Sequence, residues 1–193
     1  MRKLIVLFPF LPILAACNGD VPSASNARTL KVTKSVEISA PASRVWRIIN
    51  DFNALHRWLP TIEETQITKG RNNKPGTIRR LSLRTGGIVE QELLAYDAGD
   101  MSYRYKILRG VLPVSNYKST IKVEPMGQNL SEVIWTSTFQ RKDTGDKPMA
   151  GADDKAAIKA VSSAYRAGLT NLTRIAERGN SDHKNSDRKS DIR

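Results

Sequence analysis

The C-terminal third of the chain carries one long apolar stripe, and this stripe limits which folds are open to the sequence. Six large apolar residues recur at intervals of three and four between about 153 and 178, which is the spacing of one helix face: Ile158, Val161, Tyr165, Leu169, Leu172 and Ile175. Asp153 and Asp154 stand at the expected start of this helix, where carboxylates favour the helix dipole. A helix of this length needs a broad apolar surface to cover it.

The rest of the chain predicts strands that can supply that surface. Even-numbered apolar spacing predicts a first strand from Leu30 to Ile38. Pro41 begins a short helix, and Asn53 to Trp58 predicts a second one. Six further strands, separated by turn residues, are expected at about 62–68, 76–84, 88–96, 101–108, 116–124 and 131–140. We therefore predict an α+β fold in which a seven-stranded curved antiparallel sheet wraps around the long C-terminal helix.

Local sequences within this order resemble the helix-grip fold of the START-like (SRPBCC) superfamily, which includes polyketide cyclases/dehydrases and lipid-transport proteins. The matching stretches are Val36–Pro41 running into Val45-Trp46, Asp51-Phe52 before His56–Pro60, and Tyr165–Leu169. More narrowly, Leu112–Tyr117 and Val133–Trp135 resemble periplasmic accessory proteins found beside methanol dehydrogenases. The wider resemblance implies a hydrophobic small molecule or lipid bound in an internal cavity, and the narrower one implies assistance to a partner protein.

Strand parity predicts which side chains point toward the helix. Alternate residues of each strand share a face, so we predict a ligand site lined by Trp58, Leu81, Leu83, Met101, Tyr103, Tyr105, Tyr117, Trp135, Phe139, Tyr165 and Leu169. An empty apolar pocket of roughly 300 Å³ would cost on the order of 7 kcal/mol. The space must therefore be packed, wet or occupied, and the residues alone leave a packed core open as the alternative.

Catalysis is the second alternative, and it depends on two glutamates. In a cyclase or dehydratase a cavity carboxylate could relay protons, and Glu90 and Glu92 are the candidates. Parity instead favours Val89, Gln91, Leu93 and Ala95 as the inward set of that strand, so no catalytic residue is assigned. The chain has only two histidines, His56 and His183, and no clustered metal ligands or phosphate-binding glycine motif. No cofactor or metal is expected.

Basic residues are in excess, with 31 Lys and Arg against 19 Asp and Glu. Six of them are predicted to face outward from the sheet: Arg80, Arg84, Arg104, Lys106, Lys118 and Lys122. This surface could be simply solvated, could attract anionic lipid headgroups, or could dock an acidic protein such as a periplasmic redox enzyme. Nucleic acid is not expected as a partner, because no basic motif interleaved with aromatic residues is present.

The N-terminus predicts export. Arg2 and Lys3 precede a short apolar run from Leu4 to Leu14, and Leu14–Cys17 resembles the bacterial lipobox, which implies lipidation of Cys17. We expect a lipoprotein signal peptide at 1–16, the lipidated cysteine and a flexible linker at 17–28, the folded domain at 29–179 and a disordered polar tail at 180–193. Asn18 after the cysteine implies a periplasmic protein anchored to the outer membrane rather than the inner one.

Overall fold

The computed structural model describes residues 27–190, with side chains through Arg178. The predicted signal peptide, Cys17 and all but the end of the predicted linker lie outside these residues. The elements are β1 (Leu30–Ile38), α1 (Ala42–Ile49), the 3-10 helix η1 (Phe52–Arg57), β2 (Ile62–Lys69), β3 (Ile78–Leu83), β4 (Ile88–Asp97), β5 (Ser102–Gly110), β6 (Val114–Gly127), β7 (Leu130–Arg141) and α2 (Asp154–Ser190).

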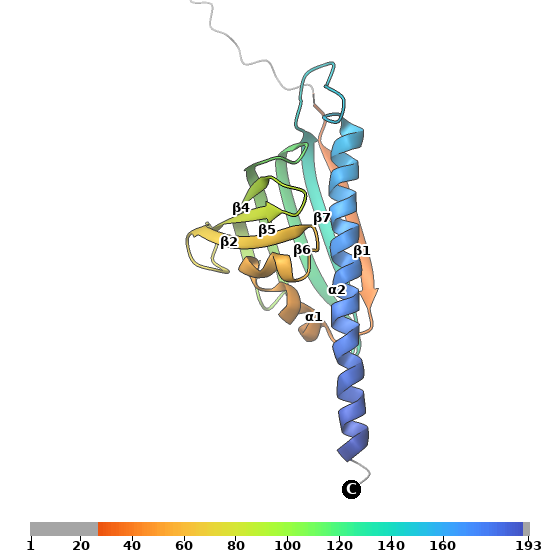
Figure 1. Cartoon of the computed structure of the whole chain (residues 1–193). Coiled ribbons are helices and arrows are strands. Elements are labelled where there is room, and N and C mark those ends of the chain that lie inside the picture. Colours follow the sequence, from red (N-terminus) through yellow and green to blue (C-terminus); the bar gives the residue numbers. More distant parts are fainter. Residues whose placement is uncertain (1–26, 191–193) are drawn as a thin grey trace, which may run out of the picture.

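The strands form one antiparallel sheet in the order β1-β7-β6-β5-β4-β3-β2. Each strand pairs with its neighbour along the chain except β1, which pairs with β7 and so places the first strand at one edge. The sheet curves, α2 packs along β1 and β7, and α1 and η1 lie near the opposite end of the sheet from the start of α2 (Figure 1). This arrangement confirms the predicted α+β helix-grip fold.

The two short helices form where the sequence predicts them. Pro41 is the N-cap of α1, and its fixed φ suits the residue that precedes a first helical turn. Val45, Trp46 and Ile49 then fall on one face of α1 and are buried. Asp51 caps η1 by accepting a hydrogen bond from the Asn53 N–H at 2.9 Å. These contacts fix the chain between β1 and β2 over one end of the sheet.

Helix α2 begins at the two aspartates, as expected. Asp153 Oδ1 accepts the Ala156 N–H at 2.7 Å, and Asp154 pairs with Arg28 and Arg141. The buried stripe is rotated slightly from the predicted one and runs through Ala157, Val161, Tyr165, Leu169, Leu172 and Ala176. Ile158 is exposed, because Ala157 takes the inward position of the first turn.

The far end of α2 differs from the sequence-based expectation. The helix continues to Ser190, whereas residues 180–193 were expected to be a disordered tail. Adding residues to an existing helix is far easier than starting one, and no proline follows Pro148 to stop it. The apolar residues stop recurring at helical spacing where the helix stops packing against the sheet, although the helix itself continues. In the described part of the chain, no helix has an apolar stretch long enough to cross a membrane.

Candidate ligand-binding site

The inner face of the sheet consists of the residues that strand parity selected. Tyr103 and Tyr105 of β5, Tyr117 of β6, and Trp135 and Phe139 of β7 are all buried. Their rings form a continuous series of contacts with neighbouring centroids about 6 Å apart, and Trp135 stacks on Tyr165 of α2 at 4.1 Å. Aromatic side chains thus join the sheet to the helix that it grips.

A cavity of about 80 Å³ remains between the sheet and α2. An apolar cavity that accepts benzene measures roughly 150 Å³, so this cavity is about half that size. The interior is therefore mostly packed at rest, because the tyrosine and tryptophan rings fill most of the space between the sheet and α2.

The predicted lining residues divide into two groups. Those on the cavity wall are Leu81, Leu83, Tyr105, Tyr117, Trp135 and Tyr165. The others, which do not border it, are Trp58, Met101, Tyr103, Phe139 and Leu169. Tyr103, for example, packs against Trp46 and Phe52, beyond the end of the cavity. These five residues belong to the core packing that the sequence left open as an alternative.

The mouth of the cavity uses residues that parity did not select. Leu112 of the β5–β6 connection and Ala160 and Ala164 of α2 line the cavity and are only half-buried, which marks the mouth, and the buried Leu55 of η1 also lines the cavity. The two alanines leave a hollow where larger helix residues would reach the sheet. The sequence-based prediction considered only large apolar side chains. It therefore missed the two alanines, which line the cavity because their side chains are small.

A hydrogen-bond network covers one wall of the cavity. Ser119 Oγ donates to the Thr136 carbonyl at 2.9 Å, so it accepts from the Tyr165 hydroxyl at 2.8 Å. The Tyr165 hydroxyl in turn accepts from Tyr117 at 2.6 Å. Trp135 Nε1 donates to both Ser119 Oγ at 3.0 Å and Tyr105 Oη at 3.2 Å. The direction of each bond follows from the acceptor-only carbonyl at the end of the chain.

Burial holds these tyrosines in their neutral form. Desolvation raises the pKa of Tyr117 and of Tyr165 well above the usual value for a phenol, and the same cause raises the pKa of Tyr103. At neutral pH the hydroxyls therefore act as hydrogen-bonding groups and not as bases.

A buried arginine stands beside the cavity, and the sequence analysis did not single it out. Arg79 of β3 is 1% exposed. Its guanidinium donates to Gln91 Oε1 from Nε at 2.9 Å and from Nη2 at 2.6 Å, and to the Phe52 carbonyl from Nη1. It also lies 3.8 Å from the centroid of the Phe52 ring. Arg79 shares a strand face with Leu81, so strand parity predicts an inward side chain, but only the register of β3 with β4 reveals its pairing with Gln91.

Arg79 has no carboxylate partner among the described residues. Its buried contacts are an amide, a carbonyl and aromatic rings, and desolvation lowers the pKa of its guanidinium. A buried cation without an anion is unusual, because burial without a counter-charge costs free energy. The interior is therefore electropositive at this point.

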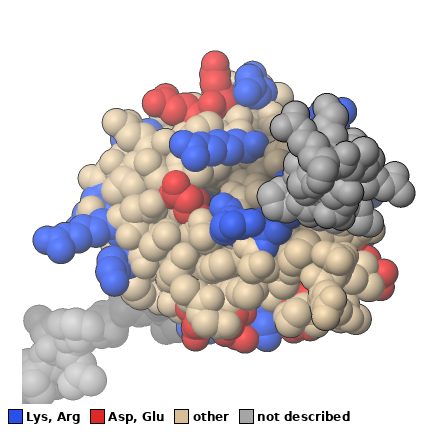
Figure 2. Space-filling model, turned by 90° about the horizontal axis from the view of Figure 1, so that it is seen from below, with Lys and Arg blue, Asp and Glu red and all other residues tan. Residues whose placement is uncertain are grey.

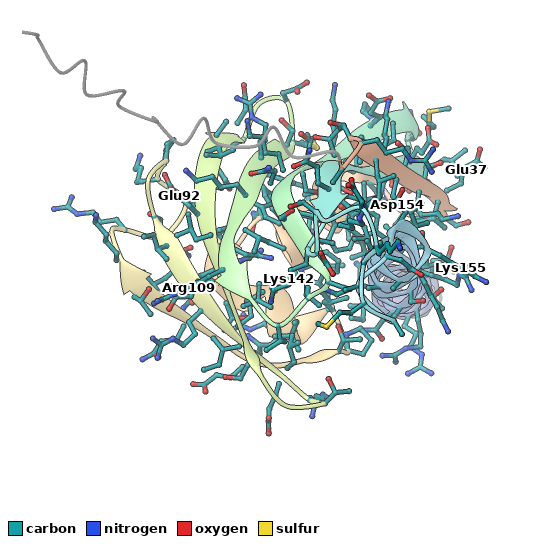
Figure 3. All side chains as sticks on the ribbon, turned by 90° about the horizontal axis from the view of Figure 1, so that it is seen from above. Glu37, Glu92, Arg109, Lys142, Asp154 and Lys155 are labelled. Atoms are coloured by element: carbon teal, nitrogen blue, oxygen red, sulfur yellow. The ribbon has the colours of Figure 1, made fainter. Side chains whose placement is uncertain are left out.

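Both candidate glutamates lie on the outer face of the sheet. Glu90 accepts from Arg109 at 2.7 Å and pairs with Arg80 at 3.3 Å, and these bonds lower the pKa of Glu90. Glu92 pairs with Lys106 at 3.0 Å. Figure 3 places Glu92 far from Asp154, where α2 begins. No Asp or Glu side chain is buried between residues 27 and 178, so the described interior offers no carboxylate for proton relay.

The predicted basic surface is partly neutralised. Arg80 and Lys106 are held by the two glutamates, and Lys122 pairs with Asp100 and Glu124. Arg84 Nε donates to the Pro60 carbonyl. Arg104 and Lys118 remain exposed and have no ion pair with any described side chain. On the face seen in Figure 2, basic and acidic side chains are likewise interspersed.

A wider groove of about 700 Å³ opens on the surface where β5 and β6 separate. The two strands pair only from Ser102↔Lys122 to Lys106↔Lys118, and beyond this point they diverge. Lys106, Arg109, Lys118 and Lys142 border the groove, and no acidic residue stands among its described lining residues. Arg109 and Lys142 lie at the end of the molecule that is seen in Figure 3.

The described residues contain no cluster of metal ligands, and His56 does not border the cavity. Between residues 27 and 178, no three His, Cys, Asp or Glu side chains gather so as to hold a metal ion. His56 lies at the end of η1 with a buried Nδ1 that has no hydrogen-bond partner, and it does not border the cavity.

Solved structures with the same fold are numerous. The protein XoxI from Bacillus cereus is 31% identical, with a TM-score of 0.67, over 76% of this chain and 94% of that one. An uncharacterised protein from Bacillus thuringiensis is also 31% identical, with a TM-score of 0.66, over 76% of this chain and 98% of that one. The Zhui aromatase/cyclase from a Streptomyces species has a TM-score of 0.64 at 19% identity, over 78% of this chain and 95% of that one, which shows a shared fold alone.

The family comparison covers nearly all of the described residues. Among curated proteins, no sequence matches the chain. The family model described as polyketide cyclase / dehydrase and lipid transport matches residues 29–177. The match spans every strand and the packed part of α2. The chain therefore belongs to the polyketide cyclase/dehydrase and lipid transport family.

Proposed function

We propose that this protein binds a hydrophobic small molecule or lipid in the cavity between the sheet and α2. The observation that carries the proposal is the mouth, where the half-buried Ala160 and Ala164 of α2 and Leu112 line the cavity. Apolar walls with a few inward polar groups are typical of small-molecule sites. Family membership supports the same function.

Because the cavity holds only about 80 Å³ at rest, a larger ligand must displace side chains at the mouth. Leu112 lies on a connection between strands, so it can move without breaking the sheet. The ligand then occupies the closed part of the cavity with one end and the mouth with the other.

Toluene is a suitable probe, because its ring has no polar group and can enter the mouth. We expect saturable binding of toluene by the wild-type chain, measured by NMR titration, with the largest shifts at Trp135 and Ala164. Ala164→Leu fills the hollow and should abolish these shifts. The matched control Thr170→Leu, at an exposed position on α2, should keep them. Equal binding by both variants, or no binding by the wild type, would contradict the proposal.

Docking of an acidic protein segment is a second candidate function. The specific observation is the basic groove between β5 and β6, where Lys118 is exposed and unpaired. Exposed charge pairs weaken with salt, so binding of a polyglutamate peptide should fall as ionic strength rises. Lys118→Glu should weaken it further, and Lys34→Glu on β1 should not. Binding that is insensitive to salt and to Lys118→Glu would remove this candidate.

We further propose that the domain is tethered through lipidated Cys17 to the periplasmic side of the outer membrane. The support is the sequence Leu14–Cys17 after a short apolar run. Two or three acyl chains hold a protein firmly to a membrane. Cys17→Ser should therefore move the protein from the membrane fraction to the soluble periplasm, and an unchanged distribution would refute the anchor.

A further inference from the structure

The cavity wall contains a side-chain amide, that of Gln91, whose orientation is fixed by hydrogen bonds from Arg79. Gln91 of β4 borders the cavity and is 6% exposed. Its Oε1 receives two hydrogen bonds from Arg79. A guanidinium can only donate, so the amide oxygen must face Arg79 and the NH2 group must face away from it. No acceptor among the described residues receives that NH2 group.

A second donor borders the same space. Tyr105 is 3% exposed, and its Oη accepts the Trp135 indole N–H at 3.2 Å. The hydroxyl hydrogen of Tyr105 has no acceptor among the described residues, whereas those of Tyr117 and Tyr165 are used within the network. Buried polar groups are nearly always hydrogen-bonded, so two unused donors on one small cavity call for an acceptor inside it.

The positive charge of Arg79 indicates which kind of hydrogen-bond acceptor fits the cavity. Arg79 is a buried cation that lacks a carboxylate partner among the described residues, and its guanidinium carbon lies 5.5 Å from the centroid of the Tyr105 ring. Its charge therefore acts on both donors. An anionic oxygen placed against them would be hydrogen-bonded and would also balance this buried charge, which a neutral oxygen cannot do.

We propose that the ligand of this cavity is an apolar molecule ending in a carboxylate, whose oxygens accept from Gln91 Nε2 and Tyr105 Oη while its apolar body lies in the mouth beside Leu112 and Ala164. The inference rests on the proposed function and adds the polar end of the ligand. Gln91 and Tyr105 are binding residues in this account. Arg79 is a positioning residue, because it acts through the amide that it orients.

Three probes of similar shape and different charge test this proposal at neutral pH: benzoate, toluene and benzylamine. Dissociation constants are measured by NMR titration of the full chain. We expect benzoate to bind at least about tenfold more tightly than toluene, which corresponds to one hydrogen bond to a charged group. We expect benzylamine, which is a cation, to bind more weakly than toluene. Benzoate binding should also shift the side-chain NH2 signals of Gln91.

Two variants test whether the preference for benzoate over toluene depends on the Tyr105 hydroxyl and the Gln91 amide. Tyr105→Phe keeps the ring and removes the hydroxyl, and it should reduce the affinity for benzoate about tenfold while leaving toluene nearly unchanged. Gln91→Leu removes the amide and should have the same effect. Because Gln91→Leu also leaves Arg79 unpartnered and can unfold the chain, Tyr105→Phe is the deciding variant. Tyr96→Phe is the control, since Tyr96 does not border the cavity.

The outcomes separate this inference from the proposed function. If toluene binds in the cavity and benzoate binds no better, the carboxylate end is wrong and the hydrophobic site stands. If Tyr105→Phe weakens the binding of toluene and of benzoate equally, the hydroxyl shapes the cavity and does not recognise the carboxylate. This result also overturns the inference. If neither probe binds, both proposals fail.

Discussion

Tyr165 connects α2 to the sheet more closely than any simple apolar residue could. Its ring stacks on Trp135, and its hydroxyl donates to Ser119 while accepting from Tyr117. The chain of bonds ends at the Thr136 carbonyl within β7. One helix residue is therefore bonded to side chains of β6 and stacked on a side chain of β7, and the helix is fixed in rotation as well as in position.

Tyr165→Phe tests this role, because it preserves the ring and removes the hydroxyl. The Tyr117 hydroxyl then loses its acceptor in a buried position, which costs about 1–3 kcal/mol of unfolding free energy. Tyr96→Phe should change stability by less than about 0.5 kcal/mol. Urea unfolding of the two variants measures the difference. Equal stabilities would show that the network adds nothing to packing.

The buried tyrosines also determine how stability depends on alkaline pH. Burial raises the pKa of Tyr103, Tyr117 and Tyr165 in the folded state above the value of 10.0 expected when unfolded. Below about pH 10 both states are protonated and stability is unaffected. Above it the unfolded state loses protons first, so the unfolding free energy falls by about 4 kcal/mol per pH unit for three such groups.

The check is urea unfolding at several pH values together with tyrosinate absorbance. We expect these three phenols to ionise only as the protein unfolds. Ionisation of all five tyrosines near pH 10 with the fold intact would contradict the buried network.

Among the elements, α2 owes its close approach to the sheet to one glycine. A Cβ added at Gly168 would lie 2.9 Å from a Leu59 methyl, 3.0 Å from the Trp135 ring and 3.2 Å from the Trp58 ring. The two indoles themselves pack at 5.3 Å between centroids. Rigid rings on two sides cannot move aside as a flexible side chain would, so the helix needs a residue without a side chain here.

Gly168→Ala should therefore lower stability although alanine favours helices. Overpacking costs about 1–3 kcal/mol and helix propensity returns about 1 kcal/mol, so the expected net loss reaches about 2 kcal/mol. Thr170→Ala, at an exposed position on the same helix, should be neutral or slightly stabilising. Thermal unfolding compares the two variants. A gain in stability for Gly168→Ala would mean that α2 does not lie this close to the sheet.

Sequence reasoning predicted the elements well for a definite physical reason. In a sheet with one buried face, side chains alternate, so correct strand positions also assign Tyr105 inward and Glu92 outward. Cavity volume follows no such rule, because it depends on how rings such as Tyr117 and Trp135 fill the space. The Arg79–Gln91 pair depends on register between strands, and the hollow at Ala164 depends on how α2 is rotated. These features required the packed structure.

For the whole molecule, the charge distribution is less one-sided than the sequence predicts. Arg80 stands in a stretch without acidic residues between Glu64 and Glu90, yet Glu90 on the neighbouring strand pairs with it, and Lys122 pairs with Asp100 as well as with Glu124 of its own strand. What remains is a groove with basic residues at one end of the sheet and a positively charged point inside the core. Ordinary packing gives no reason to bury Arg79 without an acid, so this internal charge supports the proposed binding site.

Native mass spectrometry of the protein purified from its native cells tests the central claim most directly. The account predicts that the wild-type chain carries a reproducible small-molecule adduct, which Ala164→Leu loses and Thr170→Leu retains. An adduct that survives equally in Ala164→Leu, or a wild-type chain that is always free of ligand, would contradict binding between the sheet and α2.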